Sequence, residues 1–339
     1  MYGRTSSAHT YFKNTMGFFS SLFGGKKQLT PEEIEKQNEK KFDILKFDGV
    51  KAQRMGQIPY SIKCFTEALA LKEDFSTRLY LANSYTAMQE YTLAYEQFEK
   101  MAQIDPENIE TYIMMAKTAD QLQNWQALND ACQKAFLLDD KRADIYYYFG
   151  KACYGLEDEI SAIAMLTKAV TLDENSKEAY LLRSEVLENM RQYKEAEEDI
   201  DKLLKLDGED ETYLLKKGAL RVANGSPEEA VGFFKKIIDI NPFNEPAILE
   251  LGKTLTGLKK YDEALELFNE AIENKPDFAE AYKERGNVKL QLEDKAGAME
   301  DLKKSLELAP QEGAQINGNF TNIEDEMNAR YKANNPFLG

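Results

Sequence analysis

The residue types that carry most catalytic chemistry are scarce in this sequence. His9 is the only histidine, although serine and cysteine nucleophiles and most catalytic zinc sites need a histidine held in a pocket. The cysteines are odd in number, form no CxxC pair and are expected to act as small hydrophobes: Cys64, Cys132 and Cys153. The sequence therefore predicts a chain that is not an enzyme, with no catalytic, metal-binding or cofactor-binding residues and no cofactor.

One segment resembles a nucleotide-binding motif without its context. Gly252-Lys253-Thr254 has the form of the end of a phosphate-binding loop, but Ala247 stands where that loop needs a glycine. The tripeptide also lies inside an expected helix, whereas a phosphate loop bends around its anion after a strand. We therefore interpret the match as coincidence.

Charge sets further limits on function. The 339 residues are 43% hydrophobic and 30% charged, which indicates a folded protein, and the net charge is −16. Phosphate neutralisation needs a net basic face, so no nucleic-acid partner is expected. Acid pairs such as Glu197-Glu198 and Glu228-Glu229 are interpreted as solvated helix faces. The cysteine pattern favours a reducing compartment, and we expect a cytoplasmic protein.

Three columns of residues recur along the chain at a nearly constant spacing of about 34 residues, the first step being one residue shorter than the others. The first column is small: Gly49, Ala82, Ala116, Gly150, Ser184, Gly218, Gly252 and Gly286. The second follows twelve residues later and is also mostly small: Ser61, Ala94, Leu128, Ala162, Ala196, Ala230, Ala264 and Ala298. The third follows four residues after that and is bulkier: Phe65, Phe98, Cys132, Leu166, Ile200, Phe234, Phe268 and Leu302.

Each repeating unit contains two amphipathic segments of about a dozen residues, an ordinary helix length. Small residues mark where two helices cross closely, because a larger side chain would hold them apart. One such unit cannot bury its own apolar face, whereas stacked units bury a continuous one.

This pattern resembles the tetratricopeptide repeat, a helix–turn–helix unit with a period of about 34 residues, most clearly at 247–252, 261–264 and 274–276. Eight tandem repeats are expected: 42–74, 75–108, 109–142, 143–176, 177–210, 211–244, 245–278 and 279–312. The resemblance implies an all-α fold, a right-handed superhelical solenoid of antiparallel helix pairs. It also implies a scaffold that binds a protein or peptide.

In that family the first helix of each repeat lines a concave groove. The middle of the groove combines donors with aromatic side chains, a mixture that gives an interface both area and orientation. The expected partner-binding residues are Asn83, Lys117, Tyr147, Tyr148, Lys151 and Tyr154, which would suit a peptide with a carboxylate. The alternative is that the tyrosines pack against neighbouring helices and the lysines are solvated.

Some family members clamp the C-terminal carboxylate of heat-shock chaperones with a lysine and an asparagine four residues apart, followed by residues in the next two repeats. Lys283 and Asn287 match the first part but lie in the last expected repeat. Leu79 stands where a lysine would be needed four residues before Asn83. We therefore expect a co-chaperone-like scaffold without a complete chaperone carboxylate clamp.

The ends of the array carry helix-start signals. We expect a flexible tail over 1–30, the repeat array over 31–312, and a C-terminal capping helix and tail over 313–339. Residues 30–33 (Thr-Pro-Glu-Glu) form a capping box that begins a long first helix, and residues 321–324 have the same form. A frayed C-terminal tail is the alternative to the capping helix.

The N-terminal segment leaves several interpretations open. Residues 1–31 contain basic residues but no acid and resemble a transit peptide, whereas Met16 offers an alternative start. Four apolar side chains beside Lys26 and Lys27 could contact an anionic membrane weakly, or lie in a disordered tail: Phe18, Phe19, Leu22 and Phe23. The alternative to a groove-binding scaffold is thus a peripheral membrane adaptor tethered through residues 16–27.

Overall fold

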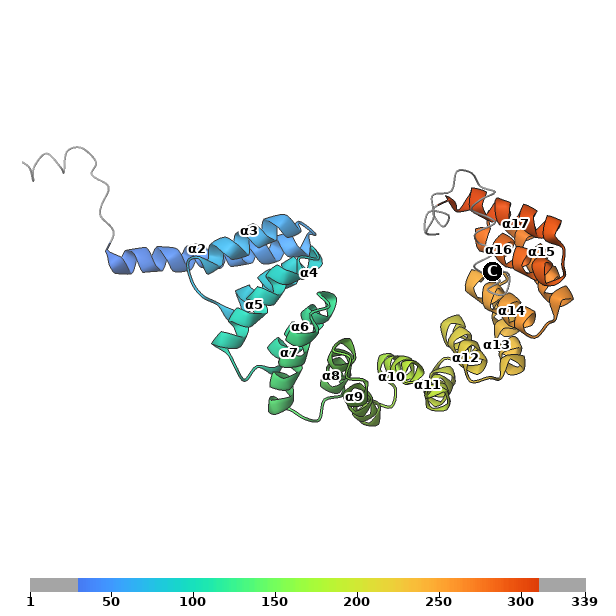
Figure 1. The fold of residues 1–339 in the computed structure, drawn as a ribbon. Coiled ribbons are helices and arrows are strands. Elements are labelled where there is room, and N and C mark those ends of the chain that lie inside the picture. Colours follow the sequence, from blue (N-terminus) through green and yellow to red (C-terminus); the bar gives the residue numbers. More distant parts are fainter. Residues whose placement is uncertain (1–29, 311–339) are drawn as a thin grey trace, which may run out of the picture. The chain divides into compact units, whose positions relative to one another are not determined.

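The computed structural model describes residues 30–310, and every regular element in that range is an α-helix (Figure 1). The first helices of the repeats are α2 (Pro31–Arg54), α4 (Phe75–Ala87), α6 (Ile109–Gln121), α8 (Ala143–Gly155), α10 (Lys177–Asn189), α12 (Glu211–Ala223), α14 (Glu245–Gly257) and α16 (Ala279–Gln291). The second helices are α3 (Ile58–Leu69), α5 (Tyr91–Ile104), α7 (Trp125–Leu138), α9 (Glu159–Leu172), α11 (Tyr193–Leu206), α13 (Pro227–Ile240), α15 (Tyr261–Asn274) and α17 (Lys295–Leu308).

This alternation confirms the all-α array of helix pairs. From α4 onward, each first helix begins at the first residue of an expected repeat. In α2 the capping box is formed as expected, because Glu33 N donates to Thr30 Oγ1 (3.2 Å) and Thr30 N donates to Glu33 Oε2 (2.9 Å). The membrane-contact residues of the N-terminal tail and the expected C-terminal capping helix lie outside the described residues.

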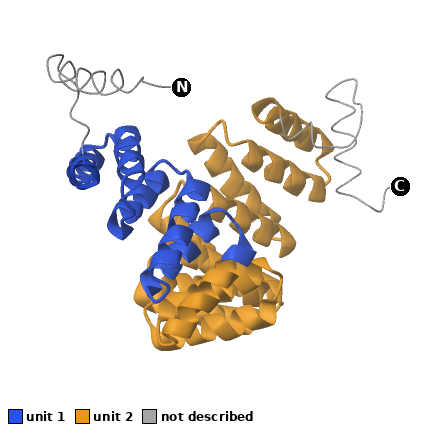
Figure 2. Ribbon diagram, turned by 90° about the vertical axis from the view of Figure 1, so that its left-hand side faces the viewer, with its two compact units in different colours: residues 1–127 blue, residues 128–339 orange. Residues whose placement is uncertain are grey.

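The chain divides into two compact units, residues 1–127 and 128–339, with the boundary inside α7 (Figure 2). In unit 1 each helix from α2 to α5 packs against the next one, and α2 also contacts α4. In unit 2 the same serial packing runs from α8 to α17, and first helices touch each other in three pairs: α8 with α10, α12 with α14 and α14 with α16. First helices therefore lie beside first helices within a unit.

A close contact between the two helices of a repeat sets their spacing. A Cβ atom built on Gly252 would lie 2.0 Å from Phe268 Cζ, and one built on Gly218 would lie 2.4 Å from Phe234 Cε1. Each phenylalanine lies sixteen residues after its glycine and is completely buried. The aromatic ring therefore rests directly on the backbone of the first helix, which only glycine permits at this distance.

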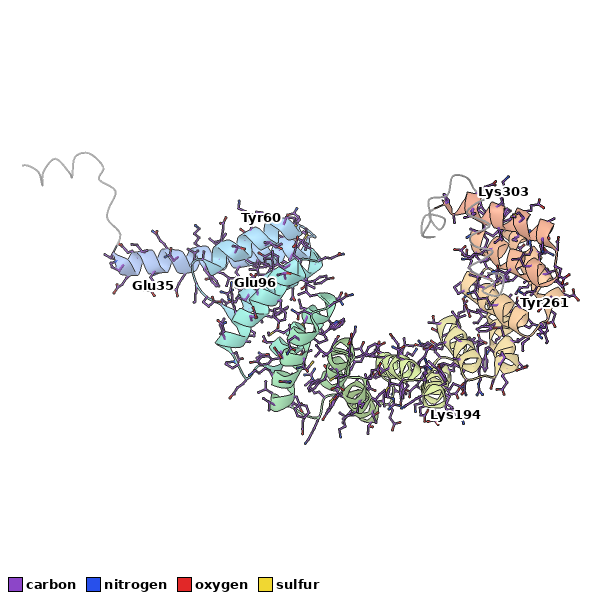
Figure 3. The ribbon with its side chains drawn as sticks, in the orientation of Figure 1. Glu35, Tyr60, Glu96, Lys194, Tyr261 and Lys303 are labelled. Carbon is purple, nitrogen blue, oxygen red and sulfur yellow. The ribbon has the colours of Figure 1, made fainter. Side chains whose placement is uncertain are left out.

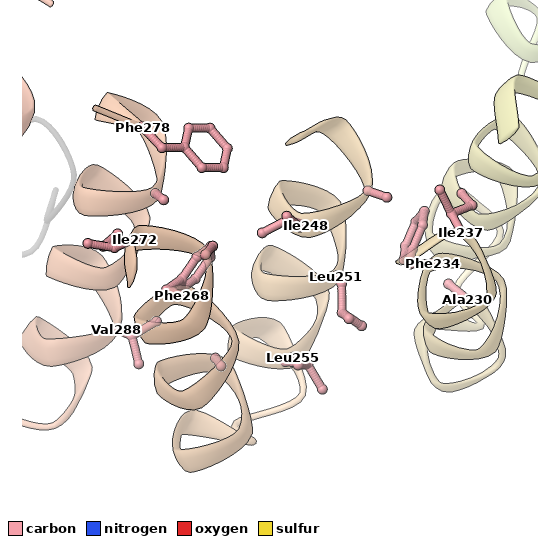
Figure 4. Close-up of a cluster of buried hydrophobic side chains, with 14 of the residues drawn as sticks. Ala230, Phe234, Ile237, Ile248, Leu251, Leu255, Phe268, Ile272, Phe278 and Val288 are labelled. Carbon is pink, nitrogen blue, oxygen red and sulfur yellow. The ribbon is translucent and has the colours of Figure 1, made fainter. Parts of the chain in front are cut away.

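These contacts belong to a continuous core. In unit 2, Phe234 and Phe268 lie in one cluster with residues from α12 to α16, including Ile248, Leu251 and Val288 (Figure 4). All eight residues of the second column, from Ser61 to Ala298, are 0% exposed. The recurring columns are therefore the positions where helices meet, as the sequence pattern predicts.

The turn inside each repeat contains one residue with a left-handed backbone. Its φ lies between 51° and 78° in all eight repeats: Gly56, Gln89, Gln123, Glu157, Arg191, Gly225, Lys259 and Glu293. Glycine adopts this conformation readily, whereas other residues pay a steric penalty. Six of the eight turns therefore hold a strained residue that packing of the flanking helices must stabilise.

Replacement of Gly252 by alanine tests the close contact. We expect Gly252→Ala to lower the free energy of unfolding by about 1–3 kcal/mol, because the new methyl group overlaps the Phe268 ring. Gly257→Ala in the same helix is the matched control, since a Cβ atom there meets nothing within 4 Å. Urea unfolding monitored by circular dichroism would measure both. Equal effects of the two substitutions would contradict the contact.

Replacement of Lys259 by glycine tests the strained turn. Because Lys259 has a φ of 60°, Lys259→Gly should raise the free energy of unfolding by about 0.5–1 kcal/mol, net of the entropy that glycine adds to the unfolded chain. The same substitution at exposed Lys253, inside α14, should instead lower it by about 1 kcal/mol. Thermal unfolding of the two variants compares them directly, and a destabilised Lys259→Gly would refute the strain.

Candidate functional site

Four of the six expected partner-binding residues lie on one helix of unit 2. Tyr147, Tyr148, Lys151 and Tyr154 are all in α8, at spacings that place them on one side of the helix. All four are half-buried. The rings of Tyr147 and Tyr148 meet edge-on, with centroids 5.1 Å apart. They form an aromatic pair about one helical turn from the Lys151 ammonium group.

Tyr154 is bound to the neighbouring first helix α10. Its hydroxyl donates to Glu185 Oε1 (3.4 Å) and accepts from the Asn189 side-chain amide. Burial and the nearby Glu185 carboxylate raise the pKa of Tyr154, so its hydroxyl stays protonated at neutral pH. Tyr154 therefore joins α8 to α10, as in the interpretation that the tyrosines pack against neighbouring helices. Asn189 takes part in this contact although its place in the sequence did not single it out.

The other two expected residues belong to unit 1. Asn83 on α4 and Lys117 on α6 are both exposed. The expected residues thus divide between the units, with a pair of polar residues in unit 1 and an aromatic-rich group on α8 in unit 2.

A row of apolar residues continues from α8 along the first helices of unit 2. Tyr147, Leu181, Leu215 and Leu249 occupy the same place in successive repeats and are each half-buried against the core. The next column along, one turn later in each helix, is mixed and polar, with Lys151, Glu185 and Lys253. This surface therefore offers an apolar strip flanked by charges, an arrangement that suits a peptide with apolar anchors.

Polar contacts also fix the first helices of unit 1. The Lys46 ammonium group lies 2.8 Å from Asp74 Oδ2, and the same carboxylate caps α4 by accepting from Thr77 N (2.8 Å). Burial raises the pKa of Asp74. Hydrogen bonds from Lys46, Thr77 and Ser76 together lower it by a larger amount, so the pKa of Asp74 lies well below its ordinary value. Asp74 therefore remains ionised in acid while the fold persists.

One sequence-based interpretation of acid pairs is wrong for Glu197. Glu198 is exposed, but Glu197 is only 5% exposed and lies between two cations of α12. Lys217 Nζ lies 3.3 Å and Arg221 Nη2 2.9 Å from its carboxylate, and Lys217 itself is 3% exposed. The prediction of a solvated Glu197 fails because the two cations that pair with it lie twenty or more residues away in the sequence. Glu228 and Glu229 are exposed, as expected.

Two further buried ion pairs repeat the same geometry. Arg183 Nη2 lies 2.6 Å from Asp199 Oδ1, and three repeats later Arg285 Nη2 lies 2.6 Å from Asp301 Oδ1. Both carboxylates are at most 4% exposed. Each guanidinium group also lies over the ring of a tyrosine three residues earlier, at 5.7 Å and 5.3 Å from the ring centroid respectively: Tyr180 and Tyr282. These arginines link the two helices of a repeat.

The cysteines lie in the core. All three are free and buried, and burial raises the pKa of the Cys132 thiol to about 12. Within residues 30–310, no three or more cysteine, histidine or acidic side chains are grouped as a metal site would require. No helix in that part of the chain is long and apolar enough to cross a membrane.

Family models place this geometry in a known class. Three models, each described as tetratricopeptide repeat, match residues 181–245, 221–286 and 279–312. The chain belongs to the tetratricopeptide-repeat proteins. No curated protein sequence matches this tetratricopeptide-repeat chain.

Solved structures agree with this assignment. The C-terminal part of a TPR repeat-containing protein from Cytophaga hutchinsonii is similar over 76% of this chain and 99% of that one, with 17% identity and a TM-score of 0.60. A tetratricopeptide repeat protein from Parabacteroides merdae covers 77% of this chain and 99% of its own, with 16% identity and a TM-score of 0.54. At such identities these likenesses show the fold alone.

The Asp74 contacts predict a pH-dependent stability. Because folding lowers the pKa of Asp74, its contribution is present at neutral pH and is lost as the pH falls below about 4, the ordinary value, through the depressed folded pKa. We expect Asp74→Asn to be less stable than the wild type by about 1–2 kcal/mol at pH 7. This difference should shrink steadily in acid.

Urea unfolding at a series of pH values measures the effect. Asp43→Asn, which alters an exposed acid on α2, is the control and should change the unfolding free energy by less than about 0.5 kcal/mol at every pH. A gap between Asp74→Asn and the wild type that stays constant down to the acid limit would rule out the linkage.

Proposed function

We propose that this tetratricopeptide-repeat protein is a non-enzymatic interaction scaffold that binds a partner protein or peptide on the first-helix surface of unit 2. The observation that supports this most directly is the group on α8. There the Tyr147–Tyr148 pair lies one turn from Lys151, beside the apolar row that continues on α10. Aromatic anchors next to a donor are typical of the residues that dominate binding energy.

The chemistry of this surface favours a particular kind of partner. Leu181, Leu215 and Leu249 would accept apolar side chains spaced along an extended or helical peptide. Lys151 would pair with a carboxylate of the same peptide near the tyrosine pair. Tyr154 would act indirectly, because its bonds to Glu185 and Asn189 hold α8 against α10.

Unit 1 would add a separate contact. Exposed Asn83 and Lys117 are donors that a partner chain can reach, and we include them in the proposal as a second group. A cytoplasmic location is part of the same proposal and follows from the cysteine pattern. The sequence-based alternative, a peripheral membrane adaptor, depends on residues 16–27, which lie outside the described range.

Affinity capture from lysate with matched baits tests the proposal. The wild-type chain is compared with Tyr148→Ala/Lys151→Glu, which removes an anchor and reverses a charge on α8. Tyr193→Ala/Lys194→Glu makes the same two changes on the second helix α11, where Lys194 is exposed (Figure 3). Circular dichroism confirms that all baits remain helical. We expect partners retained by the wild type and the α11 variant to fall at least tenfold on the α8 variant, about 1.4 kcal/mol or more.

The possible results separate the site from the function. If the α8 and α11 variants recover partners equally, the α8 surface is not the binding site. If no bait recovers a specific protein, the scaffold function itself is refuted. A third bait, Asn83→Ala/Lys117→Glu, reports on unit 1 independently.

A further inference from the structure

The first helix of unit 1 exposes large apolar side chains on one face. Ile44 is 61% exposed, Phe47 is 68% exposed and Met55 is 61% exposed. Their spacings of three and eleven residues place them on the same side of α2, together with Lys51. We call this surface, formed by Ile44, Phe47, Lys51 and Met55, the α2 face.

The positions equivalent to Ile44 and Lys51 are buried in later repeats. Six of the seven residues that correspond to Ile44 are at most 2% exposed: Thr77, Thr111, Ile145, Ala179, Ala247 and Ala281. All seven that correspond to Lys51 are at most 6% exposed: Ser84, Thr118, Ala152, Val186, Leu220, Thr254 and Val288. Within each unit, these first helices pack against the helices of the repeat before them. Ile44 and Lys51 therefore mark the side of α2 that a preceding repeat would cover. Met55, the C-cap residue, is exposed as its equivalents Met88, Leu122, Leu156 and Leu292 are.

The composition of the α2 face is unlike that of a free end. A terminal repeat needs a polar outer surface to remain soluble, because its outer helix has no neighbour. Here Ile44 and Phe47 present two large apolar side chains within one turn, and they are more exposed than most apolar residues of the described chain. Such a surface indicates a contact.

The chain itself supplies an apolar segment of suitable length. Residues 16–23, with the sequence MGFFSSLF, end only seven residues before Thr30, which caps α2. From Ser21 to Pro31 an extended chain spans up to about 33 Å. Along the helix, Pro31 and Lys51 are about 30 Å apart. A chain that reverses direction at the start of α2 therefore brings Ser21 level with Lys51.

Tethering favours this segment as the occupant. So short a connection gives the segment an effective concentration on the order of millimolar. A second copy of the chain would have to compete with this effective concentration to occupy the α2 face.

We propose that residues 16–23 fold back over the α2 face and cover Ile44 and Phe47, on the side of α2 where a preceding repeat would pack. The segment acts as an N-terminal cap for the solenoid. Phe18, Phe19, Leu22 and Phe23, the side chains that could contact a lipid surface, are then held on the protein. Docking and membrane contact exclude each other.

Disulfide trapping in the full chain tests the proposal. Ser21→Cys and Lys51→Cys place one thiol in the segment and one in the α2 face without removing an apolar side chain. The three native cysteines are buried, and the high pKa of Cys132 slows its oxidation. Under mild oxidation we expect an intramolecular disulfide between positions 21 and 51, identified by peptide mass mapping. Adding Ile44→Ser/Phe47→Ser should lower its rate of formation at least fivefold. Both residues are exposed, so the helix content should not change.

The possible results distinguish the occupants of the α2 face: the N-terminal segment or a second copy of the chain. A rate that does not depend on Ile44 and Phe47 would show a segment that does not dock, and would overturn the proposal. Disulfides between two chains would assign the α2 face to a second copy. Sedimentation with vesicles of phosphatidylserine and phosphatidylcholine gives an independent measure. Docking predicts that Ile44→Ser/Phe47→Ser binds vesicles more strongly than the wild type, and equal binding would contradict it.

Discussion

The structure depends on one contact that recurs wherever the first column holds a glycine, between that glycine of the first helix and a bulkier residue sixteen places later in the second. In unit 2, the rings of Phe234 and Phe268 lie so close to the backbone at Gly218 and Gly252 that no Cβ atom fits between them. The residues of the second column, where the helices also meet, are completely buried. The contact also fixes which side of each first helix is left over for other contacts.

The side of each first helix that does not pack against its second helix provides the surfaces on which function can depend. On α8 it carries the tyrosine pair and Lys151, and on α10, α12 and α14 it carries the half-buried leucines. Because α8 touches α10 and α12 touches α14, these surfaces cross the boundaries between repeats. On α2, which no described repeat precedes, a second side is also exposed, and it carries Ile44 and Phe47.

Much of the fold could be predicted from the sequence, because the signals that define it are local and repeated. The helix starts at 75, 109 and 143 follow from the spacing of the small residues, and the start of α2 follows from its capping box. Contacts that are specific to one repeat were not predictable. Glu197 looked solvated because its cations are distant in sequence, and Tyr154 finds Asn189 thirty-five residues later. The candidate binding residues were chosen by their place in the repeat, which could not show that they divide between two units.

The buried arginine–aspartate pairs also distinguish individual repeats from one another. Repeats built to one pattern can dock in the wrong order while the chain collapses, because their helices share the same arrangement of small and apolar residues. Arg183 finds a carboxylate at Asp199, but in the next two second helices the matching positions hold Phe233 and Leu267. A misplaced α10 would thus bury an unpaired guanidinium group against apolar side chains, which costs several kcal/mol. The charged pairs therefore label individual repeats and discourage shifted assembly.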